Sequence, residues 1–559
     1  MVAKRMSDLQ GHEFLQVQET KVGAAFVATL VNNDITAPEL YHHIRGRSDE
    51  KEWYESVKKE QDTLEGRGTW KQVKLKDVIA KGHKPIRCRH VFKVKRLKDN
   101  TIQRKSRLVV QGFSQRPGSD FSMDETYAGV IGYSSVRFLL SLACQKGYIL
   151  TQTDITGAYL EAPLEDEVYM KPPPNMWVDG RPPVDADGDE ICLRLQRSLY
   201  GLRQSGHLWA ECFKEFMTVD RKYSMGFTEL TSEPNLYRKT FELNGKKEEV
   251  LVGIYVDDAV IAASSEEARQ WFLERLASRF PVNAKSTGLI SFDDPGRILS
   301  VHVRYDIEKG ILELDQREAI EALAEKFGVT KRKPRTLPIH HSTTPPKLKT
   351  ATVDIKRYMS IIGSCLHIAQ VSRPDISFAV GALARHCSAP GEQHMECAED
   401  LIGYLYHSRH LFIGYSRQAN GNIPSVYEGN YFQGAAQRTI EDRLQASKPT
   451  PQPNSADMYC DADYAGDKIT RRSTSGMIVM MNGGPISWSS RLQKLVALSS
   501  AESEIYAVTD SVKEAIHIRL LCEECGLREP GIPTNSAWYS DEFSLLSALV
   551  ELKMLRLFT

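Results

Sequence analysis

Cysteine is scarce in this chain, with ten thiols scattered through 559 residues and no paired spacing of a disulfide framework. The sequence therefore predicts reduced thiols in an intracellular protein rather than a disulfide-stabilised secreted one. Cys522 and Cys525 form a lone CxxC without a second ligand pair, so we do not expect zinc there.

Long apolar runs are also missing. The run from Val22 to Val31 is too short to span a bilayer, and no segment has the pattern of a secretory leader, so we expect no membrane span. Apolar residues still make up 41% of the chain, which is enough for the cores of several domains.

Net charge is absent too, because 72 basic residues balance 72 acidic ones. The distribution is more informative than the sum. Between Lys81 and Arg116 there are twelve lysines and arginines but one acid, Asp99. Such a run is most often a solvated face, but its alternation with apolar residues predicts a pair of strands with one basic, phosphate-contacting face. A second acid-free basic stretch runs from Lys326 to Lys349.

The motif Tyr255-Val256-Asp257-Asp258 lies inside an apolar, β-branched run from Val250 to Ala263. Strand patterns on both sides predict a hairpin whose tight turn presents the two aspartates. Burying two acids in such surroundings is costly unless a cation offsets them, and a divalent metal is a common solution. The alternative is a solvated Asp-Asp turn. A second strand is predicted from Ile149 to Asp154, followed by a turn of small residues.

The chain around these acids resembles the reverse transcriptase and ribonuclease H region of Pol polyproteins from copia-type (Pseudoviridae) LTR retrotransposons. The resemblance covers residues from about 50 to about 545 and rests on ordered blocks: Arg104-Lys-Ser-Arg-Leu-Val-Val-Gln-Gly-Phe-Ser-Gln115, Asp154-Ile-Thr-Gly-Ala-Tyr159, Leu195-Gln-Arg-Ser-Leu-Tyr-Gly-Leu-Arg-Gln-Ser205, Arg373-Pro-Asp-Ile-Ser-Phe378, Asp461-Ala-Asp-Tyr-Ala-Gly-Asp467 and Leu498-Ser-Ser-Ala-Glu-Ser-Glu504.

The resemblance implies an α+β multidomain fold, a right-hand polymerase with a connection segment and a ribonuclease H-like α/β domain. The expected divisions are an unmatched tail (1–48), fingers and palm (49–305), thumb and connection (306–416), a flexible linker (417–457) and the ribonuclease H-like domain (458–559). Apolar periodicity predicts helices over residues 52–64 and 311–330 and a mostly helical segment from 359 to 407. The proline-rich segment 172–190 is expected to be a loop.

For the polymerase, the resemblance implies two-metal nucleotidyl transfer by Asp154, Asp257 and Asp258, with the backbone of Ile155 as a further metal ligand. Mg²⁺ is the expected ion and Mn²⁺ the alternative. Substrate contacts are implied for six residues: Tyr159 as the gate against a ribose 2′-hydroxyl, Arg107, Lys105 and Lys95 as triphosphate contacts, and Tyr200 with Gly201 beneath the templating pair.

For the ribonuclease H-like domain, the resemblance implies metal-binding, catalytic carboxylates at Asp461, Glu504 and Asp541. Glu504 is preferred to Glu502 because the residues after it match the family better. A fourth acid is expected on a following helix, and the sequence stops at Thr559 without that segment. We therefore expect a C-terminally truncated domain, which puts hydrolysis of RNA in doubt.

The implied partners are an RNA template, a DNA or tRNA-derived primer, the RNA–DNA hybrid and dNTPs. The family context also implies an intracellular protein, in a cytoplasmic virus-like particle or the nucleus, whose DNA product is destined for integration. The alternative is a decayed element remnant that binds nucleic acid without catalysis. The oligomeric state is left open by the sequence.

Overall fold

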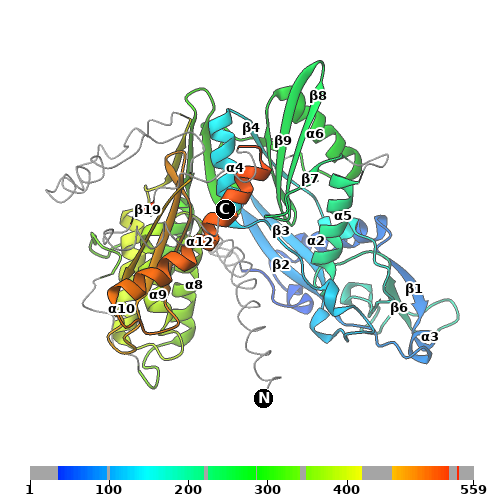
Figure 1. The fold of residues 1–559 in the computed structure, drawn as a ribbon. Coiled ribbons are helices and arrows are strands. Elements are labelled where there is room, and N and C mark those ends of the chain that lie inside the picture. Colours follow the sequence, from blue (N-terminus) through cyan, green and yellow to red (C-terminus); the bar gives the residue numbers. More distant parts are fainter. Residues whose placement is uncertain are drawn as a thin grey trace.

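The computed structural model describes residues 36–96, 101–219, 225–284, 286–339, 348–417, 456–527 and 538–539. Helices and strands are mixed throughout this part, so the α+β class is confirmed (Figure 1). Asp541, the run from Val22 to Val31 and most of the expected linker lie outside the described residues. No helix in the described part is long and apolar enough to cross a membrane.

The basic segment forms a hairpin of β2 (Cys88–Arg96) and β3 (Ile102–Val110), backed by α2 (Glu50–Gly66). This helix confirms the periodicity of residues 52–64, because its apolar residues Trp53, Val57 and Leu64 are buried. The side chains of Ser56 and Glu60 accept hydrogen bonds from backbone amides of β3, which fixes the hairpin to the helix. The short η1 (Tyr41–Ile44) precedes α2.

A three-stranded sheet lies beside this hairpin, in the order β1 (Trp70–Lys74), β6 (Ile191–Leu195), β5 (Tyr169–Met170), with α3 (Leu75–Ala80) after β1. Residues 172–190 connect β5 to β6 and contain only the 3-10 turn η5 (Pro174–Met176) as regular helix, as predicted for a loop.

The central sheet has six strands in the order β11-β4-β10-β9-β8-β7. Their bounds are β4 (Ile149–Asp154), β7 (Thr228–Glu229), β8 (Leu236–Leu243), β9 (Lys246–Tyr255), β10 (Asp258–Ala263) and β11 (Gly288–Leu289). Helix α4 (Tyr133–Lys146) packs on one face, and α5 (Ser205–Thr218) with α6 (Glu266–Arg279) packs on the other (Figure 1). Both faces are therefore buried, which explains the continuous apolar run from Val250 to Ala263.

A four-stranded sheet follows, in the order β12 (Gly296–Ile298), β13 (Val301–Asp306), β14 (Ile311–Asp315), β15 (Ile413–Ser416). The helix predicted over 311–330 is wrong for its first five residues, which form β14. Leu312 and Leu314 alternate into the core while β14 pairs with β13 and β15, so the strand period of two governs there. The helix itself is α7 (Arg317–Phe327), and its predicted apolar face is buried.

Helices α8 (Ile355–Val371), α9 (Ser377–Ala384) and α10 (Glu392–His407) confirm the mostly helical segment and pack with α7 around one core. The basic stretch before them is partly neutralised. Arg332 and Arg335 form ion pairs with Glu399 and Asp400 of α10, so these arginines hold the helices together.

The C-terminal sheet has the order β18 (Gly484–Leu492), β17 (Thr474–Met481), β16 (Ala456–Asp463), β19 (Trp538–Tyr539), and α12 (Ser500–Glu524) packs on β16 and β17. One continuous core joins this unit to α4 and the central sheet. In Figure 1, α4 accordingly lies between the central sheet and the C-terminal sheet.

Candidate active site

Three aspartates from two segments that are distant in the sequence lie together at the ends of β4 and β10, two inner strands of the central sheet. Asp154 is the last residue of β4, and Asp258, the first residue of β10, lies directly opposite it in the antiparallel register. Asp257 occupies the two-residue turn between β9 and β10, and its carbonyl oxygen accepts a hydrogen bond of 2.8 Å from the amide of Ile155. The strand end and the hairpin predicted from the sequence are therefore both present and adjacent.

The turn that presents Asp257 is strained. Val256 has a φ of +59°, a conformation that costs a β-branched residue about 1–2 kcal/mol. The indole Nε1 of buried Trp209, on α5, donates a hydrogen bond of 2.6 Å to the Val256 carbonyl and holds the turn in place. Sequence reasoning missed Trp209, although its helical spacing from Phe213 and Phe216 marks the buried face of α5. Strain of this kind is concentrated at functional sites.

Burial and neighbouring carboxylates disfavour ionisation of Asp257 and Asp258. Burial, and then the charge of Asp154, raise the pKa of Asp257. Burial, Asp257 and Asp154 raise the pKa of Asp258 to about 7. Since the Asp258 side chain is still exposed to solvent, water screens part of this repulsion. Within the described residues no lysine or arginine forms an ion pair with any of the three.

This donor set fits a divalent cation, because clustered carboxylate oxygens without an ion-paired partner are what Mg²⁺ and Mn²⁺ bind. The set is not fully converged, since the oxygens of all three aspartates do not lie within 4.8 Å of one another. A bound cation would offset the charge that raises the pKa of Asp257 and Asp258.

The basic face of the β2–β3 hairpin faces these acids. Burial, followed by repulsion from Arg107 and Lys95, lowers the pKa of Lys105 to about 8, and the charge of Asp154 opposes this decrease. The guanidinium of Arg107 lies over the ring of Tyr200, 4.2 Å from its centroid. Lys95 is exposed, and its positive charge lowers the pKa of Asp258 against the other contributions. The three predicted cations are thus grouped on one surface.

Tyr159 lies on the 3-10 turn η4 (Ala158–Glu161) that follows β4. Its ring meets the ring of Tyr200 edge-on, with centroids 5.1 Å apart. Burial, and then the nearby Asp257, raise the pKa of Tyr159 to about 12. Gly201 has a φ of +95°, and a Cβ there would lie 2.1 Å from the carbonyl oxygen of Val110, so only glycine fits this close approach.

A different acidic cluster, Asp185, Asp187 and Asp189, is the only group of three within 4.8 Å in the part of the chain that the structure describes. The ammonium of Lys74 lies among them, 3.2, 2.5 and 3.0 Å from their respective oxygens. Lys76 adds a contact of 2.6 Å to Asp189. Because the protein's own lysines neutralise the cluster, it functions as an ion-pair network that joins β1 to the 172–190 loop.

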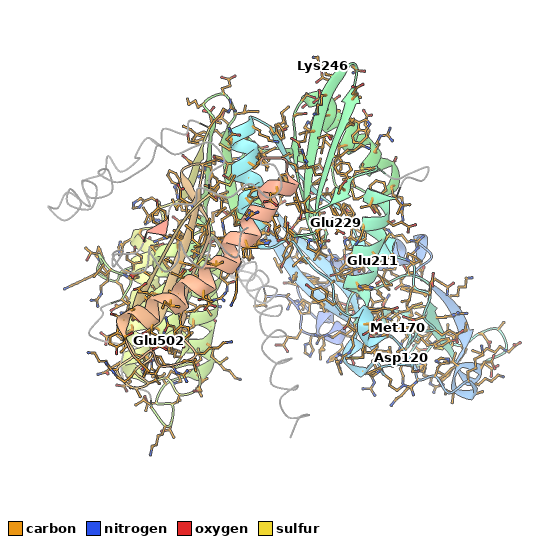
Figure 2. All side chains as sticks on the ribbon, in the orientation of Figure 1. Asp120, Met170, Glu211, Glu229, Lys246 and Glu502 are labelled. Carbon is orange, nitrogen blue, oxygen red and sulfur yellow. The ribbon has the colours of Figure 1, made fainter. Side chains whose placement is uncertain are left out.

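The second set of predicted acids lies in the C-terminal unit. Asp461, on β16, is exposed, whereas Glu504, on α12, is 8% exposed and accepts a 3.2 Å hydrogen bond from the amide of Ala462. Both acids, after burial, contribute to raising the pKa of Cys460 to about 11, so they lie near one another. Asp541 lies outside the described residues. Glu502, labelled in Figure 2, lies instead in the first turn of α12. Its amide donates to the N-cap side chain of Ser499, and its carboxylate accepts the amide of Leu498 just before the helix.

The family model for reverse transcriptase (RNA-dependent DNA polymerase) matches residues 67–341, the range that contains the β4 and β10 aspartates. The chain is 30% identical over 505 residues to the Retrovirus-related Pol polyprotein from transposon TNT 1-94 of Nicotiana tabacum, covering 89% of this chain and 33% of the relative. It is 30% identical over 448 residues to the Pol polyprotein from transposon RE1 of Arabidopsis thaliana, covering 79% and 26%. The Ty1-NL1 Gag-Pol polyprotein of Saccharomyces cerevisiae is 24% identical over 469 residues, covering 82% and 23%.

The matched range thus defines a reverse transcriptase domain. Together with these similar Pol polyproteins of plant and yeast transposons, the match supports a copia-type retrotransposon reverse transcriptase region. It spans about a third or less of the length of these relatives.

Proposed function

We propose that this chain is an RNA-directed DNA polymerase that copies RNA into DNA by two-metal nucleotidyl transfer. The observation that carries the proposal is the pairing of Asp258 with Asp154 across β10 and β4, with Asp257 in the intervening turn. Three acids on rigid strands opposite a basic hairpin suit a reaction whose substrate is a triphosphate. The finer division into fingers and palm (49–305), thumb and connection (306–416) and a ribonuclease H-like domain (458–559) belongs to this proposal.

In this mechanism Asp154, Asp257, Asp258 and the carbonyl of Ile155 hold Mg²⁺, or Mn²⁺ as the alternative. When bound there, such ions would lower the pKa of the primer 3′-hydroxyl and offset the charge of the triphosphate and the leaving pyrophosphate. The strained turn at Val256, held by Trp209, fixes Asp257 before substrate arrives.

The substrate contacts come from the basic hairpin and the two stacked tyrosines. Arg107, with Lys105 and Lys95, binds the triphosphate of the incoming dNTP. Arg107 is already oriented by Tyr200, and Tyr159 lies against the sugar, where it excludes a 2′-hydroxyl. The template is RNA and the primer is DNA or a tRNA-derived end, so the product is an RNA–DNA hybrid.

The C-terminal unit carries a second, ribonuclease H-like site in this proposal, with Asp461, Glu504 and Asp541 as its metal ligands. The packing of α12 across β16, which brings Glu504 to the strand that carries Asp461, supports this assignment. Two-metal hydrolysis of the RNA strand requires such a carboxylate group.

The proposal is tested by extension of oligo(dT) on poly(rA), with Mg²⁺ or Mn²⁺ and with EDTA as the metal-free reference. Wild-type protein is expected to extend the primer, and Asp257→Asn to lose on the order of 10³-fold of this rate. Asp187→Asn is the matched control, because it also removes one charge from an acidic cluster, and it should retain activity. Folded wild-type protein that binds hybrid but extends nothing in either metal would support the remnant instead.

A further inference from the structure

Two aromatic side chains stand in solvent beside the candidate active site. Phe113 is 76% exposed and Tyr127 is 73% exposed, the highest fractions for any aromatic residue in the described ranges. Both belong to the segment between β3 and α4, which includes η2 (Gly112–Ser114) and η3 (Met123–Glu125). Single exposed apolar residues are common, but two rings on one segment next to a reaction site require an explanation.

The segment that carries the rings is held rigidly by buried amides. The Gln115 side chain donates to Gln204 at 2.9 Å and accepts from the amide of Arg203 at 2.8 Å. Gln204 in turn donates to the carbonyl of Asp120 at 3.0 Å, and all three residues of this network, Gln115, Gln204 and Asp120, are at most 5% exposed. Asp120 marks the segment in Figure 2. Phe113 is therefore exposed on a loop that buried hydrogen bonds hold in place.

The backbone next to each ring contacts the same stretch of chain, residues 201–207. A Cβ on Gly112 would lie 2.1 Å from the carbonyl oxygen of Gly201, so Phe113 follows directly after a backbone contact. On the other side, the carbonyl of Tyr127 lies 3.0 Å from Nδ1 of His207. The chain segments that carry the two rings are thus anchored to opposite ends of one short stretch, which leads into the first turn of α5.

This stretch is continuous with the proposed nucleotide site. The amide of Val110 donates to the carbonyl of Tyr200 at 2.8 Å, and the Tyr200 ring contacts both Arg107 and Tyr159. The aromatic pair consequently lies a few residues beyond the Tyr200 end of the site.

Charge along the same edge favours a polyanion. Arg87, Arg89, Arg116 and Arg203 are exposed, and the carbonyl of Arg87 accepts the amide of Gln111, next to Gly112. The exposed Asp124 on η3, three residues before Tyr127, disfavours phosphate on that side of the segment. A single-stranded nucleic acid that places its phosphates on the arginines and its bases toward the aromatic rings satisfies both conditions.

We propose that Phe113 and Tyr127 form a stacking platform for unpaired bases of the single-stranded template before they enter the site. Base–aromatic stacking tolerates any sequence, as copying of a long template demands. The inference rests on the proposed function, since it takes Asp154, Asp257 and Asp258 as the site that the template approaches.

The test measures binding rather than synthesis. Fluorescence anisotropy without metal compares a primer–template having an overhang of about one unpaired template nucleotide with one having about eight. Wild-type protein should bind the longer overhang more tightly. Phe113→Ala should weaken binding to the longer overhang about tenfold and leave binding to the shorter one unchanged, and Tyr127→Ala should act in the same direction. Phe113→Trp should restore the preference.

The control is Ile79→Ala, which removes an exposed apolar side chain from α3, away from the two rings in the sequence. It should leave the affinities for both overhang lengths unchanged. Equal losses at both overhang lengths, no loss at either, or a wild-type protein without overhang preference would overturn the platform. Asp257→Asn should keep the preference while losing extension. If the overhang preference does not depend on Phe113 in a protein that extends primers, the platform fails while the proposed function stands. If the preference depends on Phe113 but no primer is extended, the proposed function fails instead.

Discussion

The two carboxylate sets of this molecule are built differently. In the central sheet, adjacent antiparallel strands place Asp154 and Asp258 directly opposite each other, and Asp257 lies in the connecting turn. In the C-terminal unit, a helix lies across a strand, Asp461 is exposed, and Glu504 accepts the amide of Ala462.

The two sets differ in how well the protein itself satisfies the carboxylates when no metal is bound. Burial and the neighbouring carboxylates raise the pKa of Asp257 and Asp258, and the charges of Arg107, Lys105 and Lys95 offset this rise only in part. Glu504 has a backbone donor. A divalent cation bound by the central aspartates would offset their crowded charge, which agrees with the proposal that they hold the metals of nucleotidyl transfer.

The first prediction tests whether these two regions are separate bodies. Buried Arg137 of α4 donates to carbonyl oxygens of Ile486, Gln370 and Val371 at 2.8, 2.9 and 3.0 Å, and stacks 3.9 Å from the ring centroid of Trp488. Arg137→Ala should lower the free energy of unfolding by about 3 kcal/mol, because three carbonyls, those of Ile486 and Val371 in buried contacts, lose their donor. Urea unfolding followed by circular dichroism measures this change.

The control for Arg137 is Arg297→Ala, which removes an exposed ion pair to Glu318 at 3.7 Å and should cost less than about 0.5 kcal/mol. Equal urea midpoints for the two variants would mean that the C-terminal sheet does not stabilise the polymerase region.

A second prediction concerns sugar selection and sharpens the assignment of the first site. Tyr159→Val should reduce the preference for dTTP over UTP by on the order of 10²-fold, because this variant loses the ring that we propose excludes the 2′-hydroxyl. Competitive incorporation on poly(rA) measures the ratio. Tyr200→Phe keeps the neighbouring ring and should leave the preference intact; a Tyr159 variant with unchanged selectivity would remove this residue from the gate.

The smallest expected effect is a dependence of stability on pH. The pKa of Asp258 is about 7 in the folded protein against 3.8 in the unfolded chain. Between these values the unfolded chain releases a proton that the folded protein retains, so the stabilising contribution present below pH 3.8 is lost as pH rises toward 7. Asp258→Asn removes this loss, and its advantage in urea midpoint should grow from pH 4 to pH 7 and then level off.

Solvent screening at the exposed Asp258 makes this advantage smaller than the full shift implies. Added Mg²⁺ should reduce it at pH 8, since the ion stabilises the wild-type carboxylates. A difference in urea midpoint between Asp258→Asn and wild type that is constant over pH would contradict the raised pKa of Asp258.

The sequence predicted the elements that follow from local patterns. The strand ending at Asp154, the hairpin around Asp257, the helix with Trp53, Val57 and Leu64 inward and the paired basic strands are all confirmed. Each is specified by the periodicity of a single segment or of two neighbouring ones.

The parts that the sequence did not predict depend on distant contacts. Residues 311–315 form a strand because they pair with β13 and β15, although they directly precede a helix with strong apolar periodicity. The bond from Trp209 to the strained Val256 joins residues 47 positions apart, and Lys74 neutralises acids more than 100 positions away. No local pattern carries such information.

The most direct measurement is primer extension on poly(rA)/oligo(dT) by Asp257→Asn and Asp461→Asn, compared in one preparation with wild type. The account predicts that Asp257→Asn abolishes extension, whereas Asp461→Asn extends at the wild-type rate, because Asp257 and not Asp461 belongs to the proposed polymerase site at the ends of β4 and β10. Extension retained by Asp257→Asn, or lost with Asp461→Asn in a folded protein, would contradict the assignment of the polymerase site.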